Sequence, residues 1–177
     1  MKLIEALKEQ KALAKKNDDL KKLVRDNSAY LSNETPPYGD NTAKKIEGWI
    51  QSYSDNLKRI LYLRTAVART NLATQVTIAI GGKEVTQSIA EWIHRRRDLA
   101  IEEYGIWAVL TDRGLKERTE MTSTGQKNEI KIVRNYDPET RDDKMSLFKS
   151  EPLLIDAQLE IINAITDVIE DEAVAEA

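Results

Sequence analysis

The sequence predicts a mainly α-helical protein, in which long amphipathic and coiled-coil helices form an elongated bundle with a small antiparallel β element. Charged residues make up 32% of the 177 residues and aromatic residues only 6%, which is typical of helices with solvated faces. Apolar side chains recur at spacings of three and four along most of the chain. In two places, runs rich in β-branched residues interrupt this helical spacing. We therefore expect a hairpin at about 75–85 and a further strand at 129–134.

The N-terminal segment carries a coiled-coil pattern. When Leu3 is given heptad position a, the a and d positions hold Leu3, Ala6, Gln10, Leu13, Asn17, Leu20, Val24 and Asn27. A buried Asn17 would lower stability and fix the register or the number of chains. An ordinary amphipathic helix packed inside one subunit explains the same pattern, and both interpretations stay open.

A second long helix is expected from about Thr42 to about Ala73. Two prolines and a glycine within residues 32–41 end the first helix, and Asp40 or Asn41 can cap the second. Its expected inward face consists of Ile46, Trp49, Ile50, Tyr53, Leu57, Ile60, Leu61 and Val67. Some thirty residues make a rod of roughly 45–50 Å, which favours an elongated subunit.

The stretch "IAIGGKEVTQ" at 78–87 resembles a phosphate-binding loop at first sight. Such a loop needs a glycine five positions before the Gly-Lys pair and a hydroxyl residue after it. Here Thr77 and Glu84 occupy those positions. We therefore predict a two-residue turn at Gly81-Gly82, with a partner strand that begins at Lys83.

Two further helices complete the expected elements. Ser88 and Glu91 form a capping-box pattern at the start of a helix that runs to about Arg113, with Leu99, Ile106 and Val109 among its inward residues. The strand at 129–134 is able to pair with the first hairpin. Asp137-Pro138 begins the last helix, in which Pro152 predicts a kink or a restart. Leu154, Ile161 and Ile165 widen its apolar stripe, so this helix is expected to contact more than one neighbour.

We expect one elongated domain over residues 1–177. Its parts are an N-terminal coiled-coil helix at 1–30, a helix-hairpin-helix body with a strand at 42–136, and a C-terminal helix with an acidic end at 137–177. Eight acidic residues and no Lys or Arg follow from Glu151 onward, whereas all 27 basic residues precede it. This asymmetry indicates charge complementarity within a chain or between subunits.

No catalytic, cofactor-binding or metal-binding residues are expected. The chain has no cysteine and one histidine, His94, which precedes three consecutive arginines. Successive helical residues point about 100° apart, so Arg95, Arg96 and Arg97 cannot form one flat patch alone. Ion pairs with Glu91, Asp98, Glu102 or the acidic end are the favoured use. Contact with an anion or nucleic acid through Arg69, Arg95, Arg96 and Arg97 is the alternative.

Three blocks of sequence carry a family resemblance. They are "MKLIEALKEQKALAKKNDDLKKLVRDN", then "RTNLATQV" with "GGKEVTQSIAEWIHRRRDL", and "NEIKIVRNYD" leading into the last amphipathic helix. Together they span most of the chain and resemble the septicolysin-like proteins, a family of small bacterial and phage proteins. The resemblance implies a coiled-coil-rich helical fold with a small β element, assembling as a homo-oligomer. The proline-bearing last helix and the long acidic end depart from the family.

The leading functional hypothesis is a non-enzymatic, self-assembling structural protein, such as a head-decorating or connector-type component of a phage virion. Its partners would be copies of itself and other virion proteins, and its location the cytoplasm or the virion. The alternatives are an oligomer that binds anions or nucleic acid through the arginines, and a membrane-active, cytolysin-like protein; we expect neither nucleic acid nor membrane as the main partner. The expected oligomer interface consists of Leu3, Leu13, Asn17, Leu20, Val24, Phe148, Ile155, Leu159 and Ile162.

Overall fold

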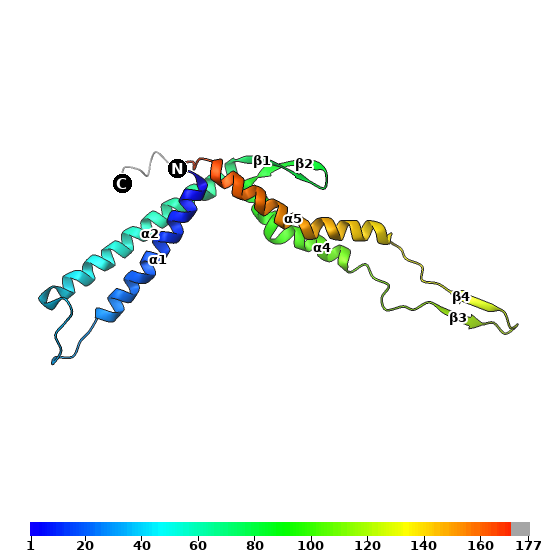
Figure 1. Ribbon diagram of the computed structural model, residues 1–177, viewed down its shortest axis with the longest axis horizontal. Coiled ribbons are helices and arrows are strands. Elements are labelled where there is room, and N and C mark those ends of the chain that lie inside the picture. The colour runs from blue at the N-terminus through cyan, green and yellow to red at the C-terminus, as the bar shows by residue number, and fades with distance from the viewer. Residues whose placement is uncertain (171–177) are drawn as a thin grey trace. The chain divides into compact units, whose positions relative to one another are not determined.

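The protein is mainly helical, as the sequence predicts; its computed structural model describes residues 1–170 (Figure 1). The α-helices are α1 (Leu3–Asn27), α2 (Thr42–Ala73), α3 (Ile89–His94), α4 (Ala100–Ala108) and α5 (Pro138–Ile165). The strands form two separate pairs, β1 (Gln75–Ile80) with β2 (Lys83–Ser88) and β3 (Arg118–Met121) with β4 (Lys127–Ile130). A 3₁₀ turn, η1 (Gly39–Asn41), precedes α2, and a π-helical segment, η2 (Arg95–Leu99), joins α3 to α4.

The chain divides into two compact units where we expected one domain. The N-terminal unit consists of Met1–Gln75 together with the chain from Leu159 onward, and the central unit of Val76–Gln158. The second helix, expected at about 42–73, is confirmed, since α2 spans Thr42–Ala73. The acidic end of the expected C-terminal helix lies in part outside the described residues, because α5 ends at Ile165 and the description ends at residue 170.

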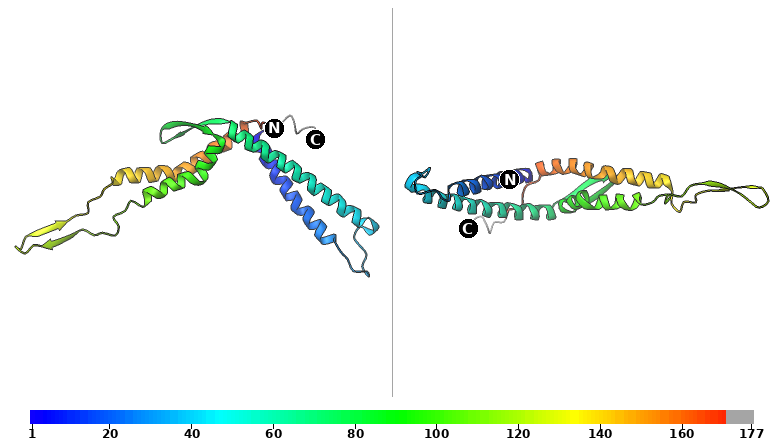
Figure 2. Two further views of the ribbon diagram at one scale, coloured as in Figure 1. Left: turned by 180° about the vertical axis from the view of Figure 1, so that it is seen from behind. Right: turned by 90° about the horizontal axis from the view of Figure 1, so that it is seen from below.

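A hairpin of two long helices forms the body of the N-terminal unit. Figures 1 and 2 show α1 and α2 side by side, joined by the proline-containing loop. The heptad positions of α1 face α2, and Leu3 and Leu20 are buried there with Leu63 of α2. The buried Asn17 accepts a hydrogen bond of 2.8 Å from Nδ2 of Asn56 in α2. Asn17 therefore fixes the register of two helices within one chain.

The two ends of the described chain meet at the end of this hairpin. The backbone N–H of Leu3 donates to the carbonyl of Thr166, and the N–H of Val168 donates to the carbonyl of Met1. Lys2 forms an ion pair of 2.8 Å with Asp167. These bonds place the segment after α5 against the N-terminal unit, although some 160 residues separate the partners in sequence.

The predicted hairpin and its turn are present in the central unit. Gly81 and Gly82 both have positive φ, at 56° and 76°, which is the signature of a type I′ turn. The turn interpretation of the glycine stretch is thus confirmed. Ser88 and Glu91 form the predicted capping box at the start of α3. The buried Trp92 of that helix donates from its indole nitrogen to the carbonyl of Val76, which ties the helix to the hairpin.

The last helix begins at the predicted cap and continues through its proline. Asp137 accepts a hydrogen bond from the backbone N–H of Thr140, which caps the first turn of α5. Pro152 lies inside the helix, which does not restart there. By contrast, the predicted caps of α2 make no side-chain cap bond; the hydroxyl of Thr42 instead donates to the carbonyl of Gly39.

The predicted pairing of the strand near 129–134 is wrong. Strand β4 begins earlier, at Lys127, and pairs antiparallel with β3, with Arg118 opposite Ile130 and Met121 opposite Lys127. The reason is local: "TSTG" at 122–125 closes a turn between two neighbouring segments, so β4 finds its partner within a few residues. We had assigned no strand to residues 118–121, which lack the β-branched run that marks β1.

Candidate functional site

The arginine cluster forms ion pairs within the central unit. Arg95 lies between two carboxylates: its two terminal nitrogens each donate to Glu103 at 2.9 Å, and its Nε donates to Glu151 of α5. The side chain of Glu151 is 0% exposed, whereas that of Glu103 is 44% exposed. The hydrogen bonds to Glu151 and to Glu103 raise the pKa of Arg95. The same bonds from Arg95 lower the pKa of Glu103.

The next two arginines have partners of their own. Arg96 pairs with Asp156 on α5, and Arg97 pairs with its neighbour Asp98 at 2.7 Å. Arg97 also lies 3.2 Å from Nδ1 of His94. Glu151 and Asp156 both belong to the acidic stretch that begins at residue 151, so the predicted charge complementarity is intramolecular at these two pairs. Of the partners we named, Asp98 and the acidic stretch form ion pairs with these arginines, whereas Glu91 closes the capping box; Glu103, which we did not name, pairs with Arg95.

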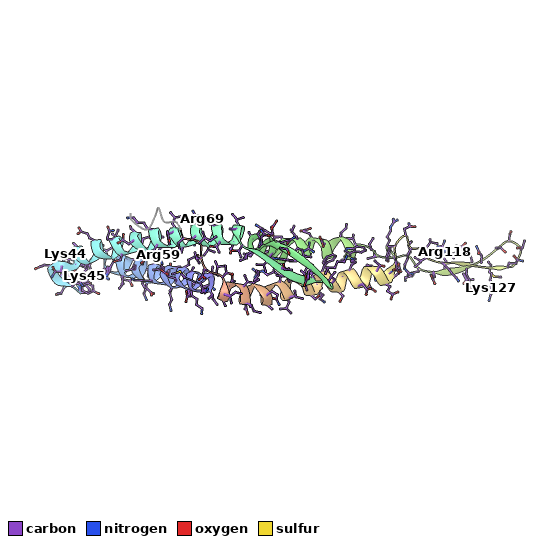
Figure 3. All side chains as sticks on the ribbon, turned by 90° about the horizontal axis from the view of Figure 1, so that it is seen from above. Lys44, Lys45, Arg59, Arg69, Arg118 and Lys127 are labelled. Carbon is purple, nitrogen blue, oxygen red and sulfur yellow. The ribbon has the colours of Figure 1, made fainter. Side chains whose placement is uncertain are left out.

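The π-helical turn explains how consecutive arginines reach the same helix. In η2 the N–H of Ala100 donates to the carbonyl of Arg95, five residues earlier, which widens the turn. Arg95 and Arg96 both reach α5 from this turn, through carboxylates five residues apart on that helix. Arg69 lies on α2 of the N-terminal unit (Figure 3). The four arginines proposed as one anion contact therefore divide between two units, and the central three, Arg95, Arg96 and Arg97, form the ion pairs described above.

Most of the predicted oligomer interface is covered within one chain. Leu3 and Ile155 are 0% exposed, and Asn17, Leu20, Leu159 and Ile162 are also buried, while Leu13, Val24 and Phe148 are half-buried. The guanidinium of Arg95 covers the ring of Phe148 at 5.8 Å. In this structure the chain's own helices cover most of the surface of these side chains, so a second copy would meet only the parts that stay exposed. Assembly itself stays a prediction.

The α2 helix exposes a second apolar stripe. From the sequence, three of its residues are expected on the inward face of the helix. Ile50, Leu57, Leu61 and Leu72 are 51%, 45%, 67% and 68% exposed, and Ala68 is exposed between them. At about 100° per residue, the five side chains fall within an arc of about 60°. The buried residues Ile60, Leu63 and Val67 point about 120° away from that arc, toward α1. The inward assignment of Ile50, Leu57 and Leu61 was therefore wrong.

Helices of the central unit leave apolar side chains exposed as well. Ile106 and Val109, which we had placed inward, are 65% and 68% exposed, and Leu99 is 51% exposed. In the last part of α5, which belongs to the N-terminal unit, Ile161 and Ile165 are 57% and 66% exposed, in line with the second apolar side predicted for that helix. Exposed leucines and isoleucines are ordinary when scattered, but aligned along one helix face they mark a contact surface.

An apolar hollow lies beside Ile50, at one end of the exposed apolar stripe of α2. It has a volume of about 270 Å³ between α1 and α2, and its lining is Leu20, Lys21, Val24, Arg25, Ile50 and Tyr53. The ammonium of Lys21 lies over the ring of Tyr53 at 5.5 Å, so the methylene stem of the lysine covers part of the lining. The hollow can accept an apolar side chain.

The β3–β4 pair forms a ribbon with a clasp at its base. Figure 3 places Arg118 and Lys127 on this ribbon, and every strand residue except the half-buried Ile130 is exposed. At the base, Arg134 donates two hydrogen bonds to the carboxylate of Asp112, from Nε at 2.7 Å and from Nη2 at 2.6 Å. These bonds lower the pKa of Asp112. An isolated two-stranded ribbon is only marginally stable in water, so the clasp helps to hold its ends together.

Neither a metal-binding cluster nor a membrane-spanning helix is found among residues 1–170. No group of three or more His, Cys, Asp and Glu side chains in this part of the chain is arranged to hold a metal ion. None of the helices described is both long enough and apolar enough to cross a lipid bilayer.

Comparison with known proteins gives one informative likeness. No protein-family model and no curated protein matches the chain. The structure is similar to the crystal structure of a functionally unknown conserved protein from Corynebacterium diphtheriae, with a TM-score of 0.58 and 20% sequence identity, over 96% of this chain and 99% of that one. At this identity the likeness shows the fold alone, and the resemblance to septicolysin-like proteins remains a prediction.

Proposed function

We propose that this chain is a non-enzymatic structural protein that assembles with copies of itself. The observation that carries the proposal is the aligned exposure of large apolar side chains on α2, from Ile50 to Leu72. Monomeric proteins rarely leave an extended apolar face in water, because each exposed CH₂ group forgoes about 0.8 kcal/mol of burial. A partner helix that covers this face would recover that free energy.

The architecture of the hairpin supports the same proposal. A pair of helices buries only the facing stripe of each, and stable helical proteins usually reach three or four helices. The α1–α2 pair has its facing stripe filled by Leu3, Leu20 and Leu63, yet α2 carries a second stripe. A second pair of helices from another copy would complete a four-helix arrangement.

The specific form that we propose is a component of a phage virion, of the head-decorating or connector type. Subunits of such particles are held by repeated contacts between identical chains. The exposed faces of α2 and of α4 offer two surfaces on one chain, which is the minimum that repeated contacts require.

Light scattering after size-exclusion chromatography tests self-assembly directly. The full-length chain, of 20.1 kDa, is expected to elute as a multiple of that mass at concentrations of about 10 µM and above, and to dissociate on dilution. A monomer throughout the range up to about 500 µM would refute the proposal, because it would exceed the concentration at which a contact of this kind forms.

A separate experiment tests the virion form. Particles purified from an induced host culture are examined by mass spectrometry for peptides of this chain, at a stoichiometry comparable with known structural proteins. Their absence from purified particles would refute the virion form while leaving self-assembly to the scattering experiment.

A further inference from the structure

We propose that α2 packs against α2 of a second copy in antiparallel orientation, about a two-fold axis beside Leu61. This inference rests on the proposed self-assembly and names the surface and the geometry that perform it. Ile50, Leu57, Leu61, Ala68 and Leu72 form the contact, and we call them the α2 stripe. The occupant of the stripe is therefore the same stripe of another chain.

The spacing of the stripe is that of a helix–helix seam. Its members follow one another in steps of seven, four, seven and four residues, which is the spacing that keeps side chains on one side of a helix over many turns. No charged residue belongs to it. From Ile50 to Leu72 the stripe is about 33 Å long, so it can match a partner helix over some six turns.

The two ends of the α2 stripe are equidistant from Leu61. Ile50 lies eleven residues before Leu61 and Leu72 lies eleven residues after it, which is about 17 Å in each direction. A two-fold axis beside Leu61 therefore places Leu61 of the two copies together and brings each Leu72 to Ile50 of the partner. This is the isologous arrangement in which one patch is complementary to itself.

The ends of the stripe have complementary shapes. At one end, the hollow of about 270 Å³ beside Ile50 is lined by Leu20, Val24 and Tyr53 with the stems of two basic residues. At the other end, Leu72 is 68% exposed. The antiparallel arrangement inserts each Leu72 into the partner's hollow, as a knob enters a hole in helix packing. A parallel arrangement would place Leu72 against Leu72 and leave both hollows empty.

The area of the contact suits a weak dimer. The stripe points about 120° away from α1, so the contact rests on one helix about 10 Å wide, and α1 contributes only at the hollow beside Ile50. Over about 33 Å this gives about 330 Å² on each copy and about 650 Å² for the pair, which is below the range of about 1,200–2,000 Å² for stable interfaces and typical of a contact that dissociates on dilution.

Charge placed at the axis is the first test. Leu61→Glu sets two carboxylates against each other in the dimer, and because Leu61 is 67% exposed, circular dichroism of the variant should match that of the parent. We expect the dimer dissociation constant, from sedimentation of the full chain, to rise at least about 100-fold. Leu153→Glu, at a residue 77% exposed on α5, is the matched control and should leave it unchanged. Leu57→Glu repeats the test about one helical turn away from the two-fold axis.

Disulfide trapping tests the orientation. The chain has no cysteine, so single cysteines report without background. Under mild oxidation, Leu61→Cys should form a covalent dimer. Ile50→Cys alone should not, because two antiparallel copies of residue 50 lie about 33 Å apart, far beyond disulfide reach. A mixture of Ile50→Cys and Leu72→Cys should form the mixed dimer.

The outcomes separate this inference from the proposed function. If the parent chain assembles but Leu61→Glu leaves the dissociation constant unchanged, the chain self-assembles through another surface and the α2 inference is overturned. Self-linking of Ile50→Cys together with failure of the mixed pair would also overturn it, in favour of a parallel contact. A parent chain that stays monomeric removes both proposals.

Discussion

Arg95→Met should destabilise the central unit by about 3 kcal/mol, because it leaves a buried carboxylate without its cation. The side chain of Glu151 is 0% exposed, and Arg95 donates to both of its oxygens. Removing one partner of a buried ion pair costs about 3–5 kcal/mol. We take the lower end of that range because the side chain of Arg95 is 21% exposed, so water reaches part of the pair.

Urea unfolding at pH 7 measures the effect. Trp92, which is 1% exposed in the same unit, contributes to the fluorescence signal together with Trp49 and Trp107. With a slope of about 2 kcal/mol per molar, a loss of about 3 kcal/mol lowers the midpoint by about 1.5 M. Protein concentration must be equal in all samples, since assembly would add to the apparent stability.

Two further variants isolate the cause. Arg96→Met removes the neighbouring arginine, whose partner Asp156 is 53% exposed, and should cost less than about 1 kcal/mol. The double variant Arg95→Met with Glu151→Met replaces both charges by apolar chains and should recover most of the stability lost in the single variant. If Arg95→Met costs no more than Arg96→Met, the pair behaves as a surface ion pair and the argument from burial fails.

Three other predictions concern the turn, the helix register and the clasp. Gly82→Val should cost about 1–2 kcal/mol in thermal melts, because its φ of 76° is left-handed while an added Cβ meets no atom within 4 Å; Lys83→Ala should change little, and ATP with magnesium should stabilise neither. A nucleotide-dependent rise in melting temperature that Lys83→Ala abolishes would refute the turn interpretation. Asn17→Ala should cost about 2 kcal/mol in urea unfolding, since it leaves the buried amide of its α2 partner without an acceptor; no change would show that the pair does not hold the register. Arg134 holds the pKa of Asp112 below its usual value, so the clasp's contribution is present above about pH 4 and is lost as pH falls through the lowered pKa. Limited proteolysis of the ribbon should therefore quicken at low pH in the parent chain and be pH-independent in Asp112→Asn; equal pH dependence in both would contradict this role.

The α2 stripe shows where sequence reasoning stopped short. Periodicity identified Ile50, Leu57 and Leu61 as apolar positions of one helix, and it merged them with Ile60 and Val67 into a single inward face. Two stripes about 120° apart both satisfy spacings of three and four. Which stripe faces the chain's own neighbour depends on where α1 packs, and that contact joins residues about 40–50 apart in sequence. The hollow at the end of the stripe is likewise built from both helices.

The sequence predicted that the arginine cluster forms ion pairs with the acidic stretch, but not which carboxylates pair with which arginines. Charge asymmetry indicated that the acidic stretch complements a basic body, and Glu151 and Asp156 are indeed partners of Arg95 and Arg96. The sequence has no signal for the π-helical turn that directs two consecutive arginines to one helix. Such a turn depends on the packing of the helices around it, and its residues read as ordinary helix formers.

The sequence by itself determined the elements whose causes are local. The Gly81-Gly82 turn, the capping box at Ser88 and the start of α5 after Asp137 follow from residues within one turn of each other, because caps and turns satisfy backbone groups of their immediate neighbours. Only the tertiary structure decided that Asn17 meets Asn56 inside one chain, that β4 pairs with β3, and which apolar stripe of α2 stays exposed. Each of these depends on which distant segment packs against a helix or strand, and amphipathic periodicity gives the direction of an apolar face without the identity of its partner.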